Sequence, residues 1–101
     1  MTAAELMRAG ADQMETCGWA DRIRHDPQGR VCVLGAFENA LSITRLGELD
    51  GMPVLKEIAD ALSINDQRGP NYALAVWSNT SNGKAVVAAL REAATKLEAK
   101  S

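Results

Sequence analysis

The sequence predicts a mainly α-helical protein, a compact bundle of about five short helices with one small β-hairpin at about residues 22–33. Three observations lead to this fold class. Alanine, the strongest helix former, occurs 17 times in 101 residues. Apolar residues recur at helical spacing in most segments. In the one stretch where they alternate instead, they flank an Asp-Pro-Gln-Gly turn at residues 26–29. The length and the absence of a linker indicate a single domain, 1–101.

The first helix is expected to begin at Thr2 and to stop at Gly18. Thr2 and Glu5 have the Thr-x-x-Glu spacing of a capping box, in which a hydroxyl and a carboxylate satisfy free amides of the first turn. Gly18 suits a left-handed C-terminal stop, and Trp19 is then placed to fold back onto the helix end. The apolar stripe of this helix consists of Leu6, Met7, Gly10, Met14 and Cys17.

The hairpin follows from the change of period around the turn. A three-residue loop with Gly29 left-handed would pair Arg24 with Cys32 and Ile23 with Val33. This register places Ile23, Val31 and Val33 on one face, whereas the tighter two-residue register would split the apolar set. We therefore expect the first register, with Gly35 breaking the second strand.

Four more helices are expected after the hairpin, with a loop at 46–52. The first spans 36–44, and the second starts at Asp50 as its cap, with Pro53 in its first turn. The last two span 71–79 and about 84–99. The apolar positions that characterise these four helices are Phe37, Ala40 and Leu41, then Leu55, Ile58, Ala59 and Leu62, then Tyr72, Val76 and Trp77, and finally Val86, Val87, Leu90, Ala94 and Leu97.

The charge balance argues against a nucleic-acid binder. Eleven Lys and Arg against 13 Asp and Glu give a net charge of −2, so the chain lacks the basic field that binds phosphate backbones. Its basic excess is concentrated around the predicted turn. Arg22, Arg24, His25 and Arg30 are therefore the candidate partner-binding residues, although a small basic group on an acidic body is more often a solvated edge.

Compartment and cysteine usage point to a cytoplasmic protein. No apolar run approaches the ~20 residues of a membrane span, and the N-terminus has no signal-peptide pattern. Cys17 and Cys32 could pair, but a reducing compartment favours two buried free thiols. Together with His25 they are too few for a structural zinc site, so no metal is expected. The scattered glycines form no nucleotide-binding motif, so no cofactor is expected.

No catalytic residue is predicted, and we expect the protein not to be an enzyme. The only Cys-His candidates combine His25 with Cys32 or Cys17, and in the preferred register His25 and Cys32 point to opposite faces. A Cys32-dependent hydrolase is therefore the third and least favoured hypothesis. The acidic pairs Asp12 with Glu15 and Glu57 with Asp60 fit solvated helix faces.

Residues 55–79 suggest an alternative, a helix-turn-helix-like DNA-binding regulator. Residues 55–64 resemble the first helix and turn of that motif. The segment 65–70 then intervenes where a recognition helix should begin, and 72–77 offers bases no Arg, Lys or Gln. An ordinary amphipathic helix is the better interpretation.

A set of small motifs resembles a known family. The motifs are Gly18-Trp19, Gly29-x-x-Cys32-x-x-Gly35-Ala36, Trp77-Ser78-Asn79 and Val86-x-x-x-Leu90-x-x-Ala93. Together, over nearly the whole chain, they resemble an uncharacterised family of short actinobacterial and actinophage proteins with a domain of unknown function. Its members commonly show Trp-Asn-Asp where this chain has Trp77-Ser78-Asn79. The resemblance implies a bacterial or phage cytosolic setting and no known activity.

The leading functional hypothesis is a non-enzymatic protein-interaction module, a phage-encoded accessory protein that binds a host bacterial protein. Trp19, Cys32 and Trp77 are interpreted as structural anchors, and the indole nitrogens of the two tryptophans are expected to find carbonyl partners. The last helix could also pair with a copy of itself through its alanines. These are Ala85, Ala88, Ala89 and Ala93.

Overall fold

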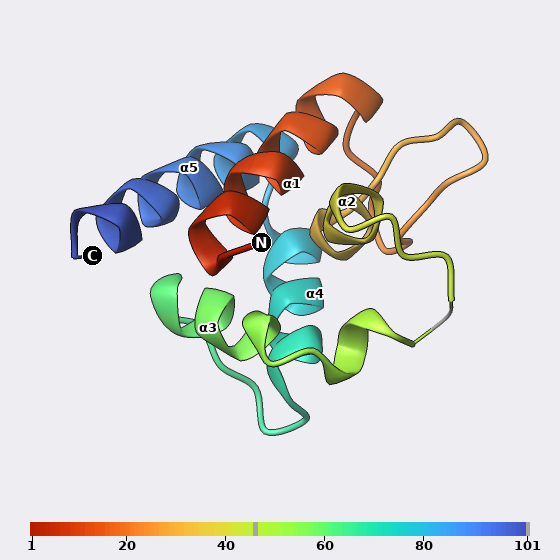
Figure 1. Ribbon diagram of the computed structural model, residues 1–101. Helices are drawn as coiled ribbons and strands as arrows, with labels where there is room; N and C mark the ends of the chain where they lie inside the picture. The colour runs from red at the N-terminus through yellow and green to blue at the C-terminus, as the bar shows by residue number, and fades with distance from the viewer. Residues whose placement is uncertain (46, 101) are drawn as a thin grey trace.

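The computed structural model describes residues 1–45 and 47–100 and confirms the mainly α-helical class. Within these residues there are five α-helices and one short 3-10 helix, with no β-strand (Figure 1). Position 46, which begins the predicted 46–52 loop, lies outside the described residues. The elements are α1 (Ala3–Cys17), α2 (Val33–Ala40), η1 (Leu49–Gly51), α3 (Val54–Ala61), α4 (Pro70–Thr80) and α5 (Gly83–Ala99).

Helix α1 begins and ends where the sequence predicts. The Thr2 hydroxyl accepts from the Glu5 amide at 3.1 Å, and the Thr2 amide donates to the Glu5 carboxylate at 2.8 Å, which completes the capping box. Gly18 has the expected positive φ of 88°, but its ψ of 160° is extended and not left-handed helical. The chain therefore leaves the helix in a direction that only glycine adopts readily.

Helices α1 and α5 lie side by side and antiparallel, in red to orange and in blue in Figure 1. Ion pairs join them along their exposed edge. Arg8 binds Glu98 near one end, and Arg91 binds Asp12 at 2.8 Å and Glu15 at 2.5 Å near the other. Between the helices and α2 to α4 lies one core. Its largest fully buried side chains are Phe37, Leu6, Met7, Leu49, Leu55, Ile58, Leu74 and Leu90.

The predicted hairpin is wrong as a pair of strands, although its register is present at the turn. Asp26 donates its amide to the Arg30 carbonyl at 2.9 Å, and Cys32 donates to the Arg24 carbonyl at 3.3 Å. Gly29 has the expected positive φ of 83°. The antiparallel pairing stops at Cys32 because this residue already occupies the N-cap position of α2. Val31, moreover, forms isolated bridges both to His25 and to Trp19.

Helix α2 differs from its prediction at both ends. It begins at Val33, three residues before the expected start at Ala36, and it ends at Ala40, four residues before the expected end at residue 44. Gly35 lies inside it. Gly35 therefore does not end a strand, as predicted, but is part of a helix. Its role is close approach, because a Cβ atom there would stand 1.8 Å from the Arg24 carbonyl oxygen. Ile23, expected on the buried face with Val31 and Val33, is exposed as a result of the lost strand.

The other helix boundaries are close to their predictions, with two corrections. Asp50 does not cap α3; it lies in η1, and Pro53 occupies the N-cap position. In α4 the predicted apolar positions Tyr72 and Val76 are exposed, and the helix buries Ala73, Leu74 and Ser78 instead. Helix α5 begins one residue early, at Gly83, with Asn82 as its N-cap.

Trp19 and Trp77 are half-buried and pack against the core, and Cys32 is buried within it. Trp19 packs closely against Gly83, because a Cβ atom added at Gly83 would stand 2.8 Å from the Trp19 Cβ. Its indole Nε1 is buried without a hydrogen-bond partner, so the expected carbonyl acceptor is absent for Trp19 in the described residues.

Both cysteines are free thiols. None of the described helices has the length and hydropathy that a bilayer span requires.

Candidate functional site

The four predicted partner-binding residues do not form one exposed basic group. Arg22 is the most exposed, with 83% of its side chain accessible. Arg30 folds back onto Asp26, whose carboxylate accepts from the Arg30 Nε at 2.5 Å. Arg24 points inward, and His25 lies beside it on the surface. Arg22 has only a long contact to a neighbouring carboxylate, with its Nε 3.8 Å from the Asp21 Oδ2, and it is therefore the least tightly held cation of the set.

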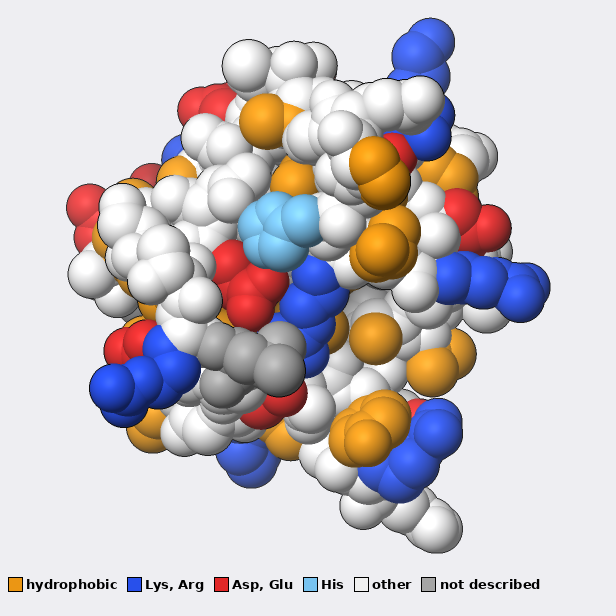
Figure 2. Space-filling model, turned by 90° about the vertical axis from the view of Figure 1, so that its right-hand side faces the viewer, with side chains coloured by type: hydrophobic (Ala, Val, Ile, Leu, Met, Phe, Trp, Pro, Cys, Tyr) orange, Lys and Arg blue, Asp and Glu red, His pale blue; other side chains and the backbone are white. Residues whose placement is uncertain are grey.

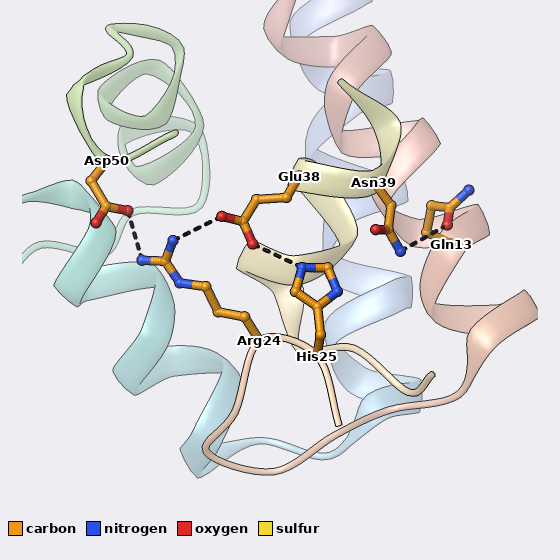
Figure 3. Close-up of polar contacts among 6 residues, drawn as sticks. All are labelled: Gln13, Arg24, His25, Glu38, Asn39 and Asp50. Atoms are coloured by element: carbon orange, nitrogen blue, oxygen red, sulfur yellow. Dashed lines mark hydrogen bonds and ion pairs between the residues drawn. The ribbon is translucent and has the colours of Figure 1, made fainter. Parts of the chain in front are cut away.

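Arg24 bridges two carboxylates from distant elements (Figure 3). It donates to Glu38 of α2 at 3.1 Å and to Asp50 of η1 at 2.6 Å. Burial acts to lower the pKa of Arg24, but the hydrogen bond and charge of Asp50, followed by those of Glu38, outweigh it, so the pKa is raised. The guanidinium is a permanent cation that ties the 22–32 loop to α2 and η1.

Glu38 is more deeply buried than Arg24 and contacts His25 as well. Only 7% of its side chain is exposed, and its second oxygen lies 2.9 Å from the His25 Nε2. With Nε2 protonated, the imidazole donates to Glu38, whose two oxygens are then both occupied. Figure 3 shows the imidazole beneath the carboxylate, on the side away from Asp50. The arrangement orients a histidine, which is one part of an acid-base site.

Sequence reasoning missed Glu38 and Asp50 as site residues. Glu38 stands directly after the apolar stretch Val33–Phe37, and a lone carboxylate on the short helix that follows a basic turn was an available signal. Asp50 offered none, because its partner Arg24 is distant in sequence and only the tertiary fold brings them together.

A groove runs between residues 22–24 and α4, with a volume of about 240 Å³. Ile23 and Tyr72 stand on its two sides with 48% and 47% of their surface exposed. Val76, one helical turn after Tyr72, is also exposed. The groove is lined by Arg22, Ile23, Arg24, Cys32, Leu34, Asp50, Asn71, Tyr72, Ala75 and Asn79. We call it the 22–24/α4 groove.

Cys32 lies on the wall of this groove but lacks the features of a nucleophile. It is 4% exposed. Burial raises the pKa of its thiol, although the amides of Gly35 and Leu34 and the charge of Arg24 act to lower it. An activated cysteine has a depressed pKa and an accessible sulfur.

Three residues of the two acidic pairs are engaged in ion pairs on helix surfaces. Asp12 and Glu15 bind Arg91, and Asp60 binds Lys56 at 3.0 Å. Among the described residues no cluster of three or more His, Cys, Asp or Glu could hold a metal ion.

Helices α3 and α4 do not have the spacing of a helix-turn-helix motif. Eight residues, 62–69, connect the two helices, where the motif has a turn of about three or four. The exposed large hydrophobic side chains of α4 are Tyr72 and Val76, and this helix carries no Arg, Lys or Gln that could read base edges. Arg68, just before α4, stacks on the Tyr72 ring at 4.9 Å and binds Asp66.

Comparison with known proteins identifies the family of this chain. The chain belongs to a family of unknown function, DUF6197, whose model matches residues 1–96. No curated protein and no solved structure matches the chain.

Proposed function

We propose that this member of a family of unknown function is a non-enzymatic protein-interaction module, and that the 22–24/α4 groove is its binding surface. One observation carries the proposal. Four large hydrophobic side chains are exposed in the described part of the chain. Two of them, Ile23 and Tyr72, line this groove, and a third, Val76, follows Tyr72 by one turn of α4. Exposed apolar side chains grouped around a hollow are typical of protein-protein contact sites.

The groove favours a short apolar segment of a partner that carries an acidic residue. An apolar side chain of the partner would insert between Ile23 and Tyr72. Arg22, exposed beside it, would pair with the acidic residue. The face in Figure 2 carries the histidine in pale blue, acidic and basic side chains beneath it, and hydrophobic side chains, in orange, to its right and below.

The four candidate residues then have different roles. Arg22 contacts the partner directly, whereas Arg24, held by Glu38 and Asp50, fixes the loop that carries Ile23. His25 lies at the end of this network, and Arg30 keeps its pairing with Asp26. The groove binds neither a cofactor nor nucleic acid in this proposal.

The proposed setting is the bacterial cytoplasm, where a phage-encoded accessory protein would bind a host protein. Support for this setting comes from the resemblance of the small motifs described above, and from two cysteines that are free thiols, as in reducing compartments.

Selection of displayed random peptides against the immobilised full chain tests the proposal without a known partner. We expect an enriched consensus with one large apolar residue and an acidic residue close to it. Binding of the consensus peptide, measured by calorimetry, should weaken at least about tenfold in Arg22→Glu and in Tyr72→Ser, which remove a charge pair and an aromatic anchor.

Lys100→Glu provides a matched charge reversal in the C-terminal cap of α5 and should leave peptide binding unchanged. No enriched consensus, or a consensus peptide that binds Arg22→Glu and Tyr72→Ser as tightly as the wild type, would rule out the 22–24/α4 groove as the binding surface.

A further inference from the structure

We propose that the exposed side of α5 pairs with α5 of a second copy of this chain, antiparallel and with a two-fold axis at Ala88. This contact is on a different surface from the 22–24/α4 groove and does not depend on the function proposed for it. A symmetric dimer uses the same patch on both copies, so the patch must be complementary to itself.

The residues that make α5 self-complementary are Lys84, Ala88 and Glu92. They are four residues apart and therefore lie on one face of the helix. All three are exposed, and 70% of the Glu92 side chain is accessible. Lys84 has no acidic partner among the described residues. Glu92 binds only Lys96, at 3.1 Å, in a solvated pair of low energetic value.

Charge complementarity fixes both the orientation and the register. In an antiparallel pair centred on Ala88, Lys84 of one copy faces Glu92 of the other, and the symmetry repeats this pair on the opposite side of the axis. In a parallel pair, Lys84 would face Lys84 and Glu92 would face Glu92, and such like-charge contacts are unfavourable. Ala88 on the axis carries only a methyl group, which allows the two helices to approach closely.

An apolar groove beside this face supplies the surface that the second copy would cover. It runs between α1 and α5, has a volume of about 680 Å³, and its apolar lining includes Met14, Trp19, Val87 and Ala88. Lys84 and Arg91 stand at its edge. Because Ala88 belongs both to the groove and to the two-fold axis, the second copy lies over the groove as well as over α5.

The structure corrects which alanines are available for this contact. Ala85 and Ala88 are exposed and Ala89 is half-buried. Ala93 is 6% exposed and packs in the core of the monomer, so it cannot contact a second copy. The proposed interface is therefore centred nearer the N-terminal end of α5 than an interface using all four alanines would be.

Sedimentation equilibrium on the full chain, at low salt and over a range of concentrations, tests the proposal. The variants are Lys84→Glu, Glu92→Lys and the charge swap that combines both. Each single reversal should raise the dimer dissociation constant at least about tenfold, because each acts twice in the symmetric interface. The charge swap restores both pairs and should return the constant to within about threefold of the wild type. Lys56→Glu, an exposed reversal on α3, should leave it unchanged.

Neither reversal should impair folding. Lys84 is in the first turn of α5, where a glutamate is favoured by the helix dipole, and Glu92→Lys removes only a solvated ion pair with Lys96. A second measurement uses Ala88→Cys in a Cys17→Ser background, which should form a disulfide dimer under mild oxidation because the two residues meet on the axis. The same background with Ala99→Cys should not crosslink at that rate. The expected dimer dissociation constant is micromolar to sub-millimolar. A wild-type chain that stays monomeric at ~0.5 mM, or single reversals that leave the dissociation constant unchanged, would overturn the proposal.

Discussion

Three glycines allow segments of the chain to touch where a side chain would separate them. A Cβ at Gly10 would stand 2.6 Å from the Phe37 ring, one at Gly35 1.8 Å from the Arg24 carbonyl oxygen, and one at Gly83 2.8 Å from the Trp19 Cβ. None of the three requires a positive φ. Their importance is therefore steric, and at Gly35 the opposing atom belongs to the backbone, which cannot move aside as a side chain can.

Gly35→Ala should destabilise the protein by about 3 kcal/mol or more, because the new methyl group must displace the 22–32 loop from α2. Urea unfolding followed by circular dichroism measures the change. Gly51→Ala is the matched control: a Cβ there meets nothing within 4 Å, so its effect should stay within about 0.5 kcal/mol. Equal stability of the two variants would contradict the close approach.

Cys32 should react slowly with iodoacetamide in the folded protein. Burial raises the pKa of its thiol and blocks access to the sulfur, so little thiolate is available at neutral pH. Cys17, which is only half-buried, serves as the internal control and should react faster. Mass spectrometry of tryptic peptides distinguishes the two sites. Rapid native labelling of Cys32 would favour the Cys32-dependent hydrolase over a structural thiol.

At the scale of elements, the exposed edge between α1 and α5 is held by two arginines that contact residues far away in sequence. Arg8 reaches Glu98 and Thr95 from α1, and Arg91 reaches Asp12 and Glu15 from α5. The contacts occur near both ends of the helix pair. They fix the antiparallel register, while the energy of association comes from the buried apolar faces beneath.

Arg91→Ala should raise the pKa of Glu15 toward its ordinary value of 4.5. The hydrogen bond from Arg91 holds that pKa low in the wild type, and this outweighs the partial desolvation of the carboxyl. Because the pKa of Glu15 is lower in the folded chain than in the unfolded chain, the ion pair stabilises the fold at pH values above the ordinary pKa. This stabilisation is lost as the pH falls through the lowered pKa. NMR titration of the Glu15 side-chain carboxyl carbon measures the change, and Lys56→Ala on α3 is the control. An unchanged Glu15 pKa would exclude the pair in solution.

The elements show what the sequence could and could not predict. Helix α1 was predictable at both ends because its capping box and Gly18 are local signals. The start of α2 was not, because the alternation in 30–33 resembles a strand, and only the contact of Val31 with both Trp19 and His25 shows that no ladder continues. The Glu38–Arg24–Asp50 contacts depend on three separate elements, and no local spacing encodes them.

At the scale of the whole molecule, the charged side chains are dispersed over the surface and largely paired. The net charge is −2. Arg8, Arg30 and Arg68, for example, each have an acidic partner within the chain. Dispersed and paired charges of this kind differ from the clustered Lys and Arg with which a protein follows a phosphate backbone.

The protein should therefore fail to bind a mixed-sequence DNA duplex even at low salt, where phosphate contacts are strongest. A gel-shift titration at about 20 mM salt measures this, with a basic DNA-binding domain as the positive control. A retarded complex that disappears as salt is added would revive the helix-turn-helix alternative, and Arg68→Ala would then test whether the segment before α4 contacts the phosphates.

The place of Trp19 gives the protein an optical reporter of its own surface. Its ring forms part of the wall of the α1–α5 groove and crosses Gly83. Indole emission depends on the polarity around the ring and on nearby quenchers, so any occupant of the groove should change its wavelength or intensity. Trp77→Phe leaves Trp19 as the single indole in the chain, and titrating that variant against itself follows occupancy without an attached dye.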